Sequence, residues 1–150
     1  MRYLTTSLIA ALLCMGQAAC HRCNCWIGTW KLDLTKSRFD PGMAPREVTL
    51  KYEDQAGALH MTLVGIDNQG NPMLIEFTAK TDGTPSPSQG SPAFDTVTVQ
   101  RIDCRTIDIT FNKPGQPARA NRTVVSKDCR ELTDRATGQG DQGVAIYYRE

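Results

Sequence analysis

Residues 48–52 read Val-Thr-Leu-Lys-Tyr, and residues 59–63 read Leu-His-Met-Thr-Leu. In both stretches apolar and polar side chains alternate, which is the period of a β-strand with one buried face. The turn-forming run 67–71 (Asp-Asn-Gln-Gly-Asn) follows the second stretch, and residues 73–77 then alternate again. Alternating stretches joined by short turn-forming segments predict antiparallel β-hairpins.

The same alternation continues along the chain without helical periodicity, which predicts an all-β protein. We predict an antiparallel up-and-down β-barrel of about eight to ten strands, because closure leaves no open sheet edge. A β-sandwich is the alternative, because strand number and spacing fit both architectures. Residues 36–45 and 84–92 contain several prolines and are predicted to be loops. The remaining predicted strands lie in residues 26–32, 97–99, 107–111, 124–125, 132–133 and 144–148.

The length and charge of the chain limit the classes of function. A chain of 150 residues favours a single domain with its own core. The 17 Lys and Arg residues nearly balance the 16 Asp and Glu residues, and they are scattered singly. A nucleic-acid-binding protein needs clustered basic residues, so this pattern argues against nucleic acid as a partner.

The N-terminus has the pattern of a secretory signal. Arg2 precedes an apolar run that is too short to span a bilayer, and small residues follow it. We expect a signal peptide at residues 1–19, a Cys-rich tether at 20–25 and a barrel domain at 26–150. The expected location of the exported protein is the periplasm or cell envelope.

The sequence is compatible with two mature forms of the exported protein, one lipidated and one soluble. Ala18-Ala19-Cys20 resembles a bacterial lipoprotein box, in which the cysteine is acylated and becomes the new N-terminus, although Gln17 replaces its usual aliphatic residue. Lipidation of Cys20 would leave an even number of mature cysteines for disulfides, whereas a soluble secreted form would keep an odd number. A lipid anchor at Cys20 is the one membrane contact that we expect.

The remaining cysteines predict disulfides rather than a metal site. Cys104 and Cys129 lie in two predicted turns separated by one hairpin, and alternate turns of a meander share one end of the sheet. We therefore predict a Cys104–Cys129 bridge. Cys23 and Cys25 pair with each other or are tethered elsewhere. Their spacing is too compressed for a zinc site, and export favours oxidation.

Residues 28–32 (Gly-Thr-Trp-Lys-Leu), with Phe39 and Asp40 shortly after, resemble the opening of lipocalins and fatty-acid-binding proteins. This resemblance implies that Trp30 packs beneath a ligand cavity. The layout of the chain, including residues 124–128 and the tyrosine-rich end, is also similar to uncharacterised secreted bacterial lipocalin-like proteins. That second resemblance brings no known activity with it.

The last strand departs from the fatty-acid-binding pattern. Those proteins place an Arg two residues before a ligand-binding Tyr, whereas here Ile146 stands two residues before Tyr148. A cation for an acidic ligand would then have to come from other strands. The candidate ligand-binding residues are therefore Trp30, Arg101, Arg119, Arg122 and Tyr148.

No arrangement of residues predicts an enzyme or a cofactor. His60 alternates with Leu59 and Met61, so its side chain is expected on the face opposite to theirs, and no nucleophile lies near it in sequence. We expect a binding protein whose barrel takes a small apolar or amphipathic ligand. The alternative is a structural or protein-binding envelope lipoprotein, for example an inhibitor, that acts through the loop at residues 84–92.

Overall fold

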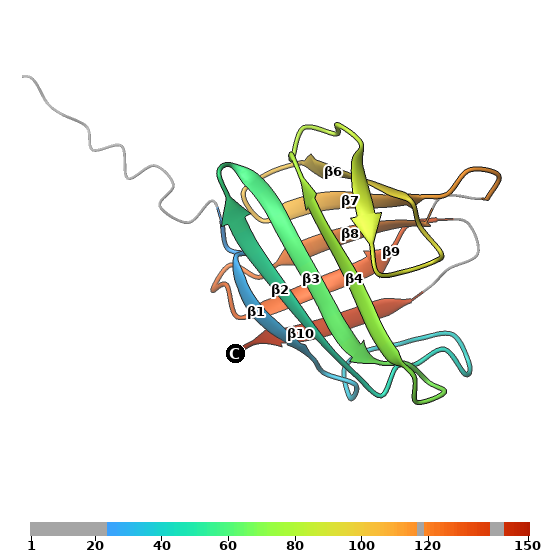
Figure 1. Cartoon of the computed structure of the whole chain (residues 1–150). Helices are drawn as coiled ribbons and strands as arrows, with labels where there is room; N and C mark the ends of the chain where they lie inside the picture. The colour runs from blue at the N-terminus through green and yellow to red at the C-terminus, as the bar shows by residue number, and fades with distance from the viewer. Residues whose placement is uncertain (1–23, 117–118, 139–142) are drawn as a thin grey trace, which may run out of the picture.

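The computed structural model describes residues 24–116, 119–138 and 143–150, and within these ranges the chain forms ten β-strands and no helix (Figure 1). No described segment is therefore a helix that could cross a membrane. The expected signal peptide at residues 1–19, and Cys20 and Cys23, lie outside the described residues. The strands are β1 Gly28–Leu32, β2 Glu47–Gln55, β3 Ala58–Ile66, β4 Pro72–Ala79, β5 Ser86–Gln89, β6 Thr96–Arg101, β7 Thr106–Asn112, β8 Arg119–Val125, β9 Glu131–Ala136 and β10 Val144–Arg149.

The ten described strands form one closed antiparallel barrel, in which each strand pairs with its neighbours in sequence and β1 pairs with β10. Trp30 in β1 lies opposite Leu50 of β2 on one side and Arg149 of β10 on the other. This last pairing removes both sheet edges. The predicted up-and-down barrel is thus confirmed, and the alternative of a β-sandwich is excluded.

The period-two alternation places one residue of every pair inside the barrel. The apolar members of the alternating stretches are buried, while their polar neighbours face solvent or lie at the surface of the sheet. His60 lies on the outer face as expected, with its Nδ1 2.9 Å from Thr78 Oγ1 and its Nε2 3.4 Å from Glu76 Oε1. Buried residues of the core include Val48, Leu50, Leu59, Met61, Phe77, Val97, Val99, Ile107 and Ile109.

The prediction of a loop throughout residues 84–92 is wrong in part, because β5 lies inside this segment. β5 pairs with β4 at only two positions, Glu76 with Gln89 and Phe77 with Ser88, and it makes two further pairs with β6. A segment rich in Pro and Ser has little strand propensity of its own. The unpaired edges of β4 and β6 supply hydrogen-bonding partners that outweigh this weak propensity.

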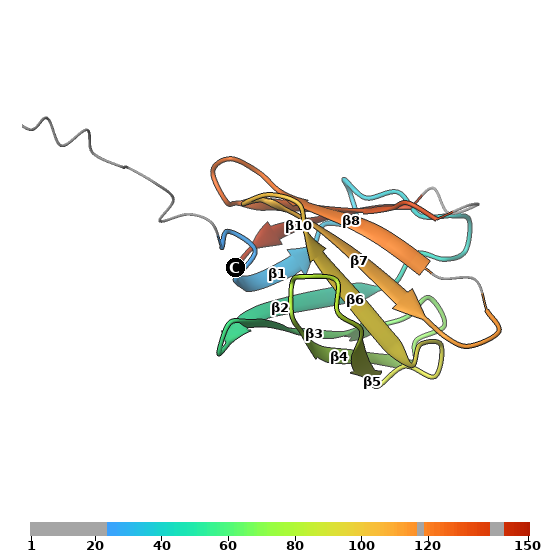
Figure 2. The same cartoon turned by 90° about the horizontal axis from the view of Figure 1, so that it is seen from above.

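The two ends of the barrel differ. At one end, the mouth, the long connection at residues 33–46 and the β3–β4 turn at 67–71 lie side by side (Figures 1 and 2). At the other, the closed end, residues 24–27 meet the turn after β8 through a disulfide bond, and Trp26 and Trp30 are buried. The strands therefore run from a plugged end of the barrel to an end that is covered by loops.

Candidate functional site

The barrel encloses a cavity of about 360 Å³ near the mouth. Most of its wall is apolar and comes from inward-facing residues of β2, β3, β4 and β7. Phe94 and Phe111 belong to this lining, with their ring centroids 4.7 Å apart, and Phe111 also packs edge-on against Phe77 behind it. The apolar lining residues include Val48, Leu50, Met61, Leu63, Met73, Ile75, Phe94, Ile109, Phe111 and Ala145.

Polar side chains gather on the opposite wall, where β8, β9 and β10 face inward. Asn121, Asp134 and Tyr147 line the cavity there. The Asp134 carboxylate accepts hydrogen bonds from Asn121 Nδ2 at 2.9 Å and from Thr123 Oγ1 at 3.0 Å. A carboxylate inside a barrel has to be hydrogen-bonded in this way, because an unpaired buried charge is strongly unfavourable. We call Asn121, Thr123 and Asp134 the polar cluster.

Two lining tyrosines, Tyr147 of β10 and Tyr52 of β2, bring hydroxyl groups close to Asp134. Burial raises the pKa of the Tyr52 hydroxyl, and the negative charge of Asp134 raises it further. Burial likewise raises the pKa of Tyr147 well above its usual value, again with a contribution from Asp134. Both hydroxyls therefore stay protonated and uncharged at any physiological pH.

The connection at residues 33–46 covers the mouth. Phe39, Asp40, Met43 and Pro45 from this connection line the cavity together with Asp67 and Asn68 of the β3–β4 turn. A backbone bridge between Arg38 and Val144 ties the connection to β10. Met43 is 67% exposed, so an apolar side chain stands at the rim of the cavity.

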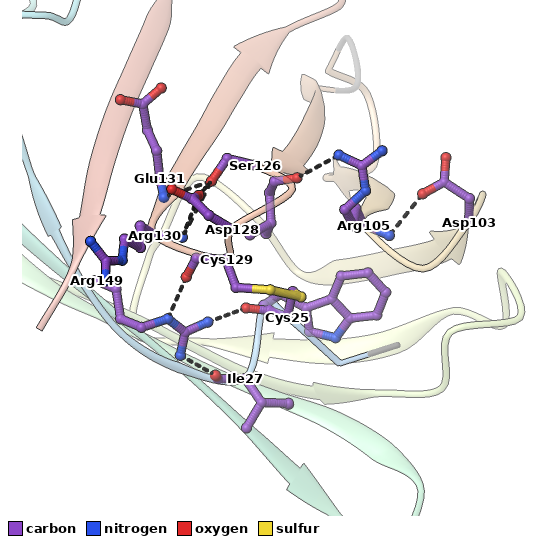
Figure 3. Close-up of a disulfide and its surroundings, with 12 residues drawn as sticks. Cys25, Ile27, Asp103, Arg105, Ser126, Asp128, Cys129, Arg130, Glu131 and Arg149 are labelled. Atoms are coloured by element: carbon purple, nitrogen blue, oxygen red, sulfur yellow. Dashed lines mark hydrogen bonds between the residues drawn. A yellow bond between two sulfur atoms is a disulfide. The ribbon is translucent and has the colours of Figure 1, made fainter. Parts of the chain in front are cut away.

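Trp30 and Arg149 plug the closed end. The Trp30 indole Nε1 donates to the Trp26 carbonyl at 2.7 Å, and the Arg149 guanidinium lies 4.3 Å from the centre of the Trp30 ring. That guanidinium also donates to the carbonyls of Cys25, Ile27 and Cys129 (Figure 3). Burial lowers the pKa of Arg149, and these acceptors satisfy the charge that burial desolvates.

The predicted Cys104–Cys129 bridge is wrong, because Cys129 is bonded to Cys25 (Figure 3). Cys104 is disulfide-bonded as well. The turns that hold Cys104 and Cys129 do lie at the same end of the barrel, as expected. The closure of β1 onto β10, however, brings Cys25 to within 5.3 Å of Cys129, between Cα atoms. Cys25 is buried at this junction and so belongs to the barrel.

The structure brings one of the five expected ligand-binding residues to the cavity. Arg119 lines it at the mouth end of β8. Trp30 lies at the closed end, and Arg101 lies there too, 4.8 Å from the centre of the Trp26 ring. Arg122 makes a two-pronged pair with Asp108, with both N–O distances 2.7 Å, and Tyr148 is 46% exposed on the outer face.

Sequence reasoning missed the polar cluster and Tyr147. Asn121 and Asp134 alternate with residues that point outward, so the strand period places them inside, but charged and amide side chains are usually assigned to solvent. Tyr147 and Tyr148 are adjacent, so only one of them faces inward. In the register of β10 against β1, Tyr147 lies opposite the buried Leu32, so Tyr147 is the tyrosine that faces inward.

Among the residues that the structure describes, no three His, Cys, Asp or Glu side chains are arranged to hold a metal ion. Comparison of the chain with protein-family models and with curated proteins found no match.

Proposed function

We propose that this chain is an exported, lipocalin-like binding protein that holds a small amphipathic ligand inside its barrel. The observation that carries the proposal is the cavity of about 360 Å³ with one apolar and one polar wall. Pockets for small molecules have volumes of about 300–1,000 Å³ and combine an apolar lining with a few polar groups. An apolar chain would lie against β2, β3 and β4, and its head group would face the polar cluster.

The closed end supports the lipocalin-like assignment. The resemblance implies that the tryptophan of the first strand packs beneath the ligand cavity, and Trp30 is completely buried at the end opposite the mouth. The plug formed by Trp30 and Arg149 leaves the mouth as the route of entry. The same geometry argues against a role for Arg101 in ligand binding, because Arg101 lies at the plugged end.

Export is supported by the disulfide bond. Cys25–Cys129 joins positions that are 104 residues apart, and stable disulfides of this kind form in oxidising compartments. Together with the signal-like N-terminus, this favours a location in the periplasm or cell envelope. Intact-mass spectrometry of membrane and soluble fractions distinguishes a protein acylated at Cys20 from an unmodified secreted form.

Filling the cavity tests the binding proposal. We expect the dye anilinonaphthalene sulfonate to bind the wild-type chain inside the barrel and to gain fluorescence there. Ile75→Trp places a larger ring in the cavity and should weaken dye binding at least about tenfold, since overpacked sites reject a ligand sterically.

Leu74→Trp is the matched control, because Leu74 is the neighbouring residue on β4 and is 45% exposed on the outer face. This variant should bind the dye like the wild type, and circular dichroism should show the same β-structure in both variants. Equal binding by all three proteins would mean that the dye sits outside the barrel. That result would reject the cavity proposal and favour the alternative of a protein that acts through its loops.

A further inference from the structure

The cavity occupies only the half of the barrel next to the mouth. On β2 its lining runs from Val48 to Tyr52, and on β4 it ends at Ile75. Nearer the closed end, the inward-facing residues of β3, β4, β7, β8 and β9 are at most 3% exposed, and none of these described residues lines the cavity. They are Leu59, Phe77, Ala79, Ile107, Thr123, Val125 and Leu132. The closed half of the barrel is therefore filled by its own side chains.

Two estimates give the size of the group that the open half encloses. The stretch of β2 from Val48 to Tyr52 is about 13 Å long as an extended strand. Barrel strands are tilted by about 40° to the axis, so the cavity is about 10 Å deep. Each carbon of an extended chain adds about 1.3 Å, so about eight carbons reach the floor. By volume, 360 Å³ is roughly twelve times the ~30 Å³ of a water molecule, and a methylene group is of similar size.

Phe77 stands where the cavity ends. It lies opposite the lining residue Met61 in the pairing of β3 with β4, and its ring centroid is 6.0 Å from that of the lining residue Phe111. A second hollow, beside Leu59 and Trp26, has a volume of about 30 Å³, which is room for about one water molecule. The Phe77 ring therefore fills the space into which the cavity would otherwise continue.

We infer that the barrel selects a compact apolar group of about twelve non-hydrogen atoms or fewer, such as a fused ring or a short chain, and that Phe77 sets this size limit. The limit presupposes the proposed binding function and specifies its ligand class. A longer acyl chain would leave its remaining carbons in water at the mouth, where they bury no apolar surface. The naphthalene ring of the dye is within the limit. A long-chain lipid therefore gains no affinity over a short one.

A homologous series of n-alkanols measures the limit. While the chain is enclosed, the affinity should rise about fifteenfold for every two methylene groups, since each one is removed from water. Titration calorimetry, with the whole protein injected into dilute hexanol, octanol, decanol or dodecanol, gives the dissociation constants. We expect the full rise from hexanol to octanol. From decanol to dodecanol the affinity should change by less than about twofold, because the added carbons stay in water.

Phe77→Ala tests the residue that sets the limit. The variant removes the ring at the floor, and neighbouring side chains relax only partly into such a space. The step from decanol to dodecanol should then rise to at least about fivefold. Val125→Ala is the control for lost packing, because Val125 is buried on β8 beyond Thr123, which is itself outside the lining. This control should keep the wild-type limit, and the same limit in Phe77→Ala would overturn the role of Phe77.

Failure of the size limit and failure of the proposed function give different results. A steady rise in affinity through dodecanol in the wild-type protein would overturn the limit and leave the cavity function intact, since the chain would then occupy a longer channel. Equal affinities along the whole series, or no binding at all, would overturn both, because neither result shows burial of the chain. The wild-type series decides this even where Phe77→Ala does not fold.

Discussion

Asp134 is a carboxylate placed inside a barrel whose other walls are mostly apolar. Its position on β9 is opposite Thr123 of β8 and Ala145 of β10. Thr123 is 1% exposed and donates its hydroxyl to the carboxylate. Valine would fill the same volume but has no hydroxyl. The threonine at this position therefore stabilises the Asp134 carboxylate as well as packing in the core.

Thr123→Val tests that role. The substitution keeps the shape of the side chain but removes the donor to Asp134 Oδ1 together with the hydroxyl that is hydrogen-bonded to Tyr52. We therefore expect the free energy of unfolding to fall by about 1–3 kcal/mol. Urea unfolding followed by tryptophan fluorescence measures the change. Thr110→Val, at an outward-facing position of β7, should alter the stability by less than about 0.5 kcal/mol. Equal effects in the two variants would contradict the assigned donor.

At the residue scale, a close contact with Arg149 requires a glycine at position 28 of the first strand. Gly28 has a φ of +139°, and a Cβ atom at this position would run into the Arg149 guanidinium. That guanidinium is held by three backbone carbonyls, so it cannot swing aside freely. The glycine lets the Arg149–Trp30 stack form against the backbone of β1.

At the scale of elements, five aspartates in the loops stabilise the connections between the strands by accepting hydrogen bonds from turn residues. The Asp67 carboxylate accepts hydrogen bonds from the backbone amides of Gln69 and Asn71, both at 2.8 Å. These hydrogen bonds hold the pKa of Asp67 below its usual value. Hydrogen bonds to turn residues also lower the pKa values of Asp33, Asp82, Asp103 and Asp128.

Acid should weaken these turns. A carboxyl group whose pKa is lower in the folded state stabilises the fold above its unfolded pKa of about 4. That contribution is lost as the pH falls through the folded value. We expect the urea midpoint to be constant from neutral pH down to about pH 5 and then to fall. Asp67→Asn should show a smaller fall, and an equal fall would contradict the contribution of Asp67.

The strands differ in whether the local sequence pattern is sufficient to predict them. β2 and β3 could be predicted from sequence because alternation, strand propensity and a turn-forming run all agree there. β5 could not, because Ser86–Gln89 has weak propensity and is extended only between the edges of β4 and β6. The four residues of β5 contain no information on the edges that β4 and β6 present to them in the folded sheet.

At the scale of the whole molecule, the Cys25–Cys129 bond joins the segment before β1 to the turn before β9. β10 lies between these two strands in the barrel. The bond therefore holds the seam where the barrel closes. Its residues lie at the end opposite the cavity, so the disulfide and the ligand site act on different parts of the fold.

Removing the bond should destabilise the barrel without altering the cavity. A disulfide that closes a loop of about 100 residues contributes about 4–5 kcal/mol in the chain-entropy account. The paired variant Cys25→Ala/Cys129→Ala should therefore show a large fall in thermal unfolding temperature in calorimetry. A non-reducing peptide map of the wild type should contain the Cys25–Cys129 peptide pair. A Cys104–Cys129 pair in that map would contradict the structure.

Sequence by itself determined that the chain is an antiparallel β protein and which apolar side chains share the buried face, because both follow from a local period of two. Closure into a barrel instead of a sandwich was decided by the pairing of β1 with β10. The tertiary structure alone decided which distant residues meet. Cys25 pairs with Cys129, Arg149 stacks on Trp30, and Asn121 and Thr123 bind Asp134. These contacts depend on the register and closure of the strands. Both are properties of the whole sheet, since the closing pair of β1 and β10 joins the two ends of the chain and sets the positions of the strands between them.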